Sequence, residues 1–168
     1  MAAARPLPFV LLAALVGGIA AAPARPASYE VALLARVNAV RTAHHLRPLV
    51  TSPSLHRAAE QHSVQMAREG YFSHRSANGA AFWRRILRFY GKGGYRYWSV
   101  GENLAWAAPR LSAARTVKLW LHSPPHRRNL LSPRWRELGL AAVHVTTGHG
   151  VYAGYSATIV TADFGVRR

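Results

Sequence analysis

The sequence predicts an α+β fold, a layered α-β-α arrangement in which helices pack on both faces of a small antiparallel sheet. Helical periodicity dominates the chain up to residue 121, whereas two β-rich runs joined by turn residues lie near its end. The chain has 168 residues, half of them apolar, which suffices for one domain with a substantial core but not for two. We therefore predict a single domain over residues 25–168.

The first residues are typical of a secretory signal peptide. Arg5 precedes an apolar run over residues 7–22, and the Ala-Pro-Ala triplet at residues 22–24 fits the small-residue pattern of a cleavage site. Residues 1–24 are therefore predicted to be removed, although a cut about one to three residues away fits equally well. The run is shorter than the ~20 residues that span a bilayer, so a retained anchor is the weaker alternative. We expect a secreted protein, extracellular or periplasmic, with no transmembrane span after signal removal.

Two helices are expected at the start of the domain. Ser28 can cap a helix over Tyr29–Arg41, and Pro53 opens a second helix that Gly70 ends. His62 lies on the apolar face of the second helix, which favours a hydrogen-bonded core histidine over a metal ligand.

The remaining elements follow from periodicity and composition. A short amphipathic helix over Phe82–Phe89 directs its three arginines outward, and an aromatic stretch from Tyr95 onward favours a strand. A further helix spans Ala113–Leu121. The runs Glu137–Val145 and Val151–Phe164 predict two strands, and the TTGHG segment between them predicts a hairpin connection.

The composition excludes several classes of site. The chain has no cysteine, so thiol catalysis, thiolate zinc sites and a lipoprotein anchor are excluded. Lysine and arginine number 22 against six acids, a net charge of +16, which favours contact with polyanions. Outside the cytoplasm these are acidic envelope polymers and lipid head groups, and specific nucleic-acid binding is not expected. The arginines are scattered without a repeated motif, so an arginine-rich proteome would also account for them.

The stretch LHSPPHRRNLL contains two histidines, His122 and His126, four residues apart. They would share one face only of a continuous helix, and the intervening Pro124 and Pro125 prevent that. Ser123 and Pro124 instead predict the N-cap and first position of a new short helix with His126 in its first turn. The positive end of the helix favours a neutral imidazole there, the form that a metal ligand or general base needs. His122 is expected to have no part in the site.

Glutamates are rare, and two of the five stand where a loop meets a strand: Glu102 in VGENLA and Glu137 in WRELGL. Glutamate is a poor strand former, so at such an edge it faces either solvent or a cleft. Taken singly, each position favours a surface side chain, and sequence spacing alone connects neither of them to a histidine.

Six ordered segments make the chain similar to a known family. They read LLARVNAVR, RAAEQHSVQMAREGYFSH, VGENLA, LWLHSPPHRRNLL, RELGLA and TADFG. In this order and spacing they resemble the bacterial, SCP-like extracellular branch of the CAP superfamily, named for cysteine-rich secretory proteins, antigen 5 and pathogenesis-related proteins. The resemblance covers nearly all of residues 25–168 and implies a three-layer α-β-α sandwich of the CAP type.

The resemblance also implies a cleft that gathers two histidines and two acids. The histidines are His74, which ends GYFSH, and His126, in SPPHRRNLL; the first acid is Glu102, in GEN. Animal and plant members place the second acid three residues after the helix tryptophan, where this chain has Ser123. Bacterial members carry an acid in the segment matching RELG, so Glu137 is the candidate here.

These four side chains are compatible with three kinds of site. His74, His126, Glu102 and Glu137 could coordinate Zn²⁺ or another divalent cation and leave positions open for water. They could also form a metal-free acid–base network in which each carboxylate orients an imidazole. The third alternative is a buried polar cluster that only holds the loops together.

The resemblance names a site more securely than a reaction. We expect an exported binding module that acts at the cell envelope or outside the cell, with an envelope polyanion, a lipid or a protein as its partner. The alternative is a metal-assisted hydrolase of peptide or cell-wall bonds, with Glu102 or Glu137 as its base. Catalysis is the weaker expectation because the chain has no cysteine and neither Ser73 nor Ser123 lies in a G-x-S-x-G elbow.

Overall fold

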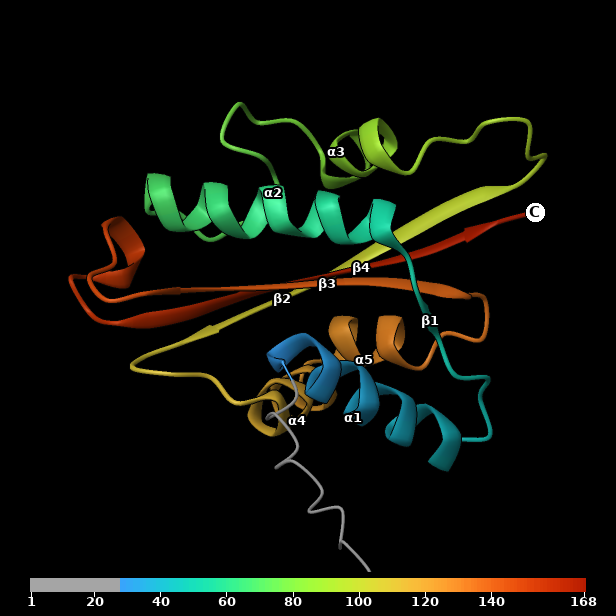
Figure 1. Ribbon diagram of the computed structural model, residues 1–168, viewed down its shortest axis with the longest axis horizontal. Helices are drawn as coiled ribbons and strands as arrows, with labels where there is room; N and C mark the ends of the chain where they lie inside the picture. The colour runs from blue at the N-terminus through green and yellow to red at the C-terminus, as the bar shows by residue number, and fades with distance from the viewer. Residues whose placement is uncertain (1–27) are drawn as a thin grey trace, which may run out of the picture.

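The computed structural model describes residues 28–168, and the predicted signal peptide lies outside them. Their elements form three layers, with a four-stranded sheet between two groups of helices (Figure 1). One face is covered by α2 (Pro53–Glu69) and α3 (Phe82–Phe89), and the other by α1 (Tyr29–Ala43), α4 (Ala113–His122) and α5 (Pro124–Leu130). The predicted α-β-α layering is confirmed. Among these helices, none is both long and apolar enough to cross a membrane.

The sheet has the strand order β1-β3-β4-β2, so β2 forms one of its edges. The strands are β1 (Val50–Thr51), β2 (Trp98–Ala107), β3 (Glu137–Val145) and β4 (Ala157–Arg167). The central β4 pairs antiparallel with both β2 and β3, which includes the predicted hairpin. The two-residue β1 joins β3 in parallel and was not predicted. The predicted antiparallel sheet is therefore three strands of a mixed sheet.

The segment before β4 differs from its prediction. The β-rich run Val151–Phe164 predicts one strand, but Gly150–Tyr152 forms a 3-10 helix and the strand begins only at Ala157. Ala153 has a φ of 51°, in the left-handed region that a strand cannot include. The Val151 N–H in the 3-10 helix also donates to the Gly70 carbonyl at 3.0 Å, a tertiary contact that local composition cannot reveal.

Most predicted helix ends are correct. The Ser28 hydroxyl accepts a hydrogen bond from the Val31 N–H at 3.3 Å, and Gly70 ends α2 with a φ of 68°. Ser123 occupies the N-cap of α5 as predicted, but its side chain makes no capping bond. The first turn of α5 relies instead on two prolines, whose fixed φ suits a helix start.

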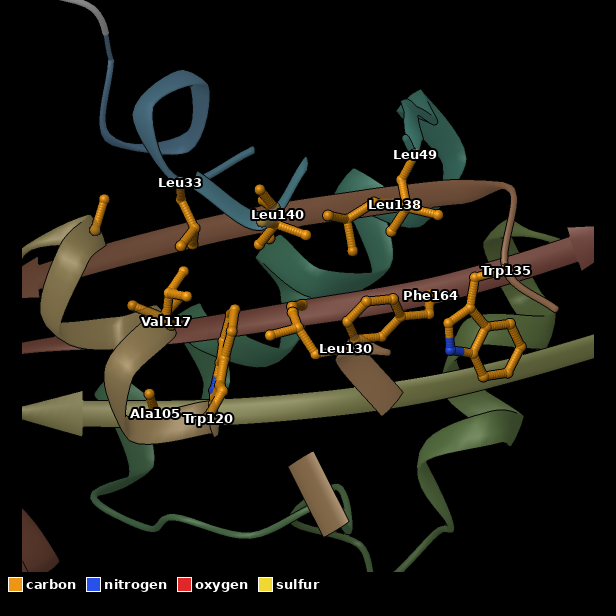
Figure 2. Packing of buried hydrophobic residues seen from close by; sticks show 14 of the residues in the cluster. Leu33, Leu49, Ala105, Val117, Trp120, Leu130, Trp135, Leu138, Leu140 and Phe164 are labelled. Carbon is orange, nitrogen blue, oxygen red and sulfur yellow. The ribbon is translucent and has the colours of Figure 1, made fainter. Parts of the chain in front are cut away.

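The largest hydrophobic cluster of the described residues lies between the sheet and helices α1, α4 and α5 (Figure 2). Leu33 of α1, Trp120 of α4 and Leu130 of α5 are fully buried there, as is Phe164 of β4. The Trp120 Nε1–H also donates to the Leu104 carbonyl of β2 at 2.9 Å. This packing holds α4, and the α5 that follows it directly, against β2.

Gly139 of β3 marks the closest approach of the sheet to α2. A Cβ at this position would lie 2.1 Å from the carbonyl carbon of Leu55 and 2.2 Å from the His56 nitrogen. Because both atoms belong to the backbone, no side-chain rotation can relieve the overlap. We expect Gly139→Ala to lower the free energy of unfolding by about 1–3 kcal/mol or more in a urea titration followed by circular dichroism.

Gly94→Ala is the matched control, because nothing lies within 4 Å of a Cβ there. We expect it to change the free energy of unfolding by less than about 0.5 kcal/mol. Equal stability of the two variants would contradict the close packing of β3 on α2.

Candidate functional site

Two consecutive residues of the edge strand β2 connect the candidate site to both faces of the sheet. Side chains alternate along a strand, so Glu102 and Asn103 point to opposite faces. Glu102 contacts the α3 side through Arg85, and Asn103 contacts α5, where its Nδ2 donates to the His126 carbonyl at 3.0 Å. The site therefore forms around the outer edge of the sheet.

His74 reaches this edge from the loop between α2 and α3. Its Nδ1 lies 2.7 Å from Glu102 Oε1, and its side chain is 50% exposed while that of Glu102 is 1% exposed. The loop is held by His62 of α2, whose Nε2 lies 2.8 Å from the Ser73 carbonyl oxygen. His62 is fully buried. The interpretation of His62 as a hydrogen-bonded core histidine is confirmed.

His126 approaches from the other face, on the first turn of α5. Its ring centroid lies 6.0 Å from that of His74. Asn129, on the same helix, donates from Nδ2 to the Glu102 carbonyl at 2.9 Å and to Asn103 Oδ1 at 3.0 Å. Three of the four predicted site residues, His74, Glu102 and His126, are thus brought together from separate segments.

Two other residues considered in the sequence analysis, Glu137 and His122, lie away from this site. Glu137 begins β3, across the central strand from β2, and its carboxylate accepts a hydrogen bond from the Tyr90 hydroxyl. Burial first, and then this bond to Glu137, raise the pKa of Tyr90. His122 is exposed, and its Nδ1 lies 2.7 Å from the carbonyl oxygen of Lys118. The structure therefore does not bring Glu137 to the histidine pair.

Two charged residues that the sequence analysis missed lie beside Glu102. Arg85 was predicted to face outward with the other arginines of α3, but it is only 3% exposed and forms a buried ion pair with Glu102. Its spacing from Phe82 and Phe89 places all three on one helix face, a signal that could have identified it. Asp163 is fully buried and lies directly opposite Glu102 in the β2–β4 register. The sequence feature that could have identified Asp163 as buried is its position as a lone aspartate inside an apolar run.

Burial dominates the electrostatics of these acids. It raises the pKa of Glu102 to about 7, against the opposing charge of Arg85. Burial and then the charge of Glu102 raise the pKa of Asp163 well above its usual range. Contact between the two acids raises the pKa of Asp163 and lowers that of Glu102, which is the direction expected when Asp163 keeps its proton and donates it to Glu102. Glu102 is then the first of the two acids to lose its proton, beside Arg85 and His74.

The same surroundings favour neutral histidines. The pKa of His74 is lowered first by burial and then by the Arg85 guanidinium. The pKa of His126 is lowered by burial and then by His74. A neutral His74 that donates from Nδ1 to Glu102 leaves Nε2 with its lone pair free. Within residues 28–168, no group of three or more His, Cys, Asp or Glu side chains is placed to hold a metal ion.

Comparison with known proteins extends these observations. The model of the cysteine-rich secretory protein family, CAP, matches residues 34–164, which include every side chain of the candidate site. The protein YkwD of Bacillus subtilis is 30% identical over 122 residues, which make up 73% of this chain and 45% of YkwD. The chain thus spans less than half the length of this relative.

Two solved structures share the fold. One is an extracellular protein containing an SCP domain from Bacillus anthracis, 29% identical with a TM-score of 0.60, matched over 81% of this chain and 39% of that chain. The other is an outer surface protein from Borrelia burgdorferi, with a TM-score of 0.66 over 83% of this chain and 92% of that chain. At 19% identity the second likeness concerns the fold alone.

Proposed function

Because this chain belongs to the cysteine-rich secretory protein family, CAP, we propose that it is an exported binding module whose paired histidines, His74 and His126, bind a divalent cation such as Zn²⁺. The family membership predicted from the ordered sequence segments is confirmed. Export is part of the proposal, supported by the signal-peptide pattern of residues 1–24 and by the description of the Bacillus anthracis relative as extracellular.

The proposal depends on one observation: the ring centroids of His74 and His126 lie 6.0 Å apart, with the buried carboxyl group of Glu102 behind His74. Glu102 bonds Nδ1 of His74, which orients the ring and increases the basicity of Nε2. A carboxylate behind a ligating histidine is the usual support for zinc. Glu102 is therefore proposed to orient His74 rather than to bind the ion itself.

Two imidazoles fill only part of the coordination sphere of zinc, which prefers four ligands. The remaining positions would be taken by water or by donor groups of a bound partner, and His74 is exposed enough to allow this. The ion would supply a Lewis acid to which an anionic or carbonyl group could bind. Such an open site suits a binding module that contacts its ligand partly through the metal.

The hydrolase alternative lacks a free base at this position. Both carboxylate oxygens of Glu102 are engaged, one by His74 and the other by Arg85, and the side chain is buried. A general base must reach the water that it deprotonates. Glu137, the other base that the sequence suggested, contacts Tyr90 instead. A binding role therefore fits the described geometry better than catalysis.

Zinc titration by isothermal calorimetry, on protein freed of metal with a chelator, tests the proposal. His74→Ala and His126→Ala are each expected to weaken zinc binding by about tenfold or more, because each removes one of two protein ligands. The double variant is expected to lose the binding event, while circular dichroism shows the native spectrum.

His122→Ala serves as the matched control. It removes an exposed histidine that lies four positions before His126. The Nδ1 of His122 already contacts the Lys118 carbonyl oxygen. We expect its zinc affinity to equal that of the unchanged protein. A double variant of His74 and His126 that still binds zinc with unchanged affinity would overturn the metal proposal.

A further inference from the structure

A basic surface lies where α5 leads into β3. Two hollows of about 650 and 360 Å³ follow one another there and share Ser132 and Pro133 in their walls. Five arginines line them, and we call this surface the basic groove: Arg127 and Arg128 in the first hollow, and Arg134, Arg136 and Arg168 in the second. No side-chain carboxylate lines either hollow.

The charges of the basic groove are not neutralised by ion pairs with the described part of the chain. Within residues 28–168, the ion pairs that involve arginine are Arg68 with Glu69 and Arg85 with Glu102. None of the five groove arginines takes part in them. Each of these arginines remains charged at any pH of interest, so the groove presents an uncompensated positive potential to solvent.

One of these arginines is held in place by the loop that carries it. Arg136 donates from Nη1 to the carbonyls of Pro133 at 2.8 Å and Trp135 at 2.9 Å. These bonds occupy one nitrogen of the guanidinium and leave the other N–H groups without a partner among the described residues. A guanidinium fixed in this way loses little freedom when it binds an anion.

A second positive charge lies beneath the same loop. Arg41 of α1 is fully buried and donates from Nη1 to the carbonyls of Leu130 at 2.8 Å and Ser132 at 3.0 Å, while its buried Nη2 has no hydrogen-bond partner among the described residues. Burial first, and then the positive charge of Arg136, lower the pKa of Arg41. The guanidinium groups of Arg41 and Arg136 thus repel one another near the loop that lines the groove. An anion bound above them would relieve this repulsion.

We propose that the basic groove binds a linear phosphate polymer, with successive phosphate groups seated in the two hollows. Guanidinium groups pair with phosphate oxygens through two parallel hydrogen bonds, which matches the side chains that line both hollows. Five arginines spread over two hollows exceed what a single phosphate can contact. The surface is concave, so it fits a chain better than the flat face of a membrane.

The aromatic side chain at the groove also favours a polymer without bases. Single-stranded nucleic acids stack their bases on open aromatic rings. Tyr97, which lines the second hollow, is instead covered by the Arg168 guanidinium at 4.8 Å from its ring centroid. The Arg168 guanidinium would thus compete with a base for the Tyr97 ring, whereas it adds to the charge that attracts phosphates.

Binding of labelled inorganic polyphosphate to the full chain, measured by fluorescence anisotropy at several salt concentrations, tests the proposal. The double variant Arg128→Gln/Arg134→Gln removes one exposed arginine from each hollow. We expect it to bind about tenfold more weakly or worse, since two charge-assisted bonds are lost. The slope of log affinity against log salt should fall by about two.

The matched control is Arg57→Gln/Arg115→Gln, which removes the same charge from exposed positions on α2 and α4 that line neither hollow. It should bind polyphosphate within about twofold of the unchanged protein, since separate surface charges are screened by salt. The His74→Ala/His126→Ala variant should also bind normally, which keeps this proposal separate from the metal proposal.

Three results would overturn the proposal. An equal loss in both arginine pairs would reduce the binding to net charge. Inorganic phosphate that competes as well as the polymer per phosphate group would indicate a single-anion site. Anionic phospholipid vesicles or single-stranded DNA whose binding depends on Arg128 and Arg134, while polyphosphate binding does not, would identify another partner.

Discussion

Replacing Arg85 with methionine is expected to destabilise the protein by about 3–5 kcal/mol above neutral pH, because the ionised Glu102 carboxylate is then buried without its cation. Arg85 and Glu102 are 3% and 1% exposed in their side chains, and Asp163 beside them is fully buried. Methionine fills much of the arginine volume, so the loss measures the charge rather than a cavity. Urea unfolding in chelator-treated buffer, followed by circular dichroism, gives the free energy directly.

The pH dependence of this loss follows from Glu102. Its pKa is raised from 4.5 to about 7 in the folded protein, so the folded state binds this proton more tightly than the unfolded chain. A raised carboxyl pKa stabilises the fold below 4.5, and that contribution disappears as pH rises through about 7. Without Arg85 the pKa rises further, because the main opposing charge is gone. Below about pH 7 Glu102 holds its proton in both folded proteins, so the destabilisation by Arg85→Met should be smaller and constant there and should grow as pH rises above about 7.

Arg84→Met provides the control, since Arg84 is the exposed neighbour that lies over the Trp83 ring at 5.3 Å. We expect it to change stability by less than about 0.5 kcal/mol at every pH. If the loss in Arg85→Met stayed constant from neutral to alkaline pH, Arg85 would act by packing and not as the counter-charge of Glu102.

Trp120→Ala is expected to cost about 3–5 kcal/mol of unfolding free energy. Trp120 is fully buried in the cluster between α4 and the sheet, and its Nε1–H bonds the Leu104 carbonyl. Alanine would leave a cavity and an unpaired carbonyl at the point where α4 is held to β2 (Figure 2). Because α5 follows α4 directly, His126 should lose part of its anchorage as well.

Thermal and urea unfolding compare the free energies of unfolding of Trp120→Ala and its control, Trp83→Ala. Trp83 is 41% exposed on α3, so its removal should cost less than about 1 kcal/mol. A Trp120→Ala protein as stable as Trp83→Ala would contradict the assignment of Trp120 to the core that positions α5.

The sequence predicted the elements that carry local signals. Helix α3 and strand β3 have the expected bounds. Ser28 caps the start of α1 and Gly70 ends α2, as expected. Strand β1 has only two residues, too few for any periodicity, and exists because it pairs with β3. The 3-10 helix Gly150–Tyr152 likewise depends on a contact with distant residues, so its β-rich composition was misleading.

The candidate site also contains residues that could be predicted and residues that could not. His74, Glu102 and His126 come from three separate segments, and the family resemblance connected them where spacing could not. The same resemblance suggested Glu137, which the structure places beside Tyr90. Asp163 stands in its place as the second acid beside Glu102, and its burial depends on strand pairing that no local pattern specifies.

The bonds that fasten α4 and α5 to β2 also protect the sheet from aggregation. An unprotected edge strand has unpaired carbonyl and N–H groups that can pair with a strand of another molecule. On β2 the carbonyls of Glu102 and Leu104 are taken by Asn129 and Trp120 side chains. At the opposite edge, beyond the short β1, the Leu140 carbonyl oxygen lies 2.6 Å from His56 Nδ1. Side chains therefore occupy hydrogen-bonding groups at both edges, and an incoming strand would have to displace them before it could pair.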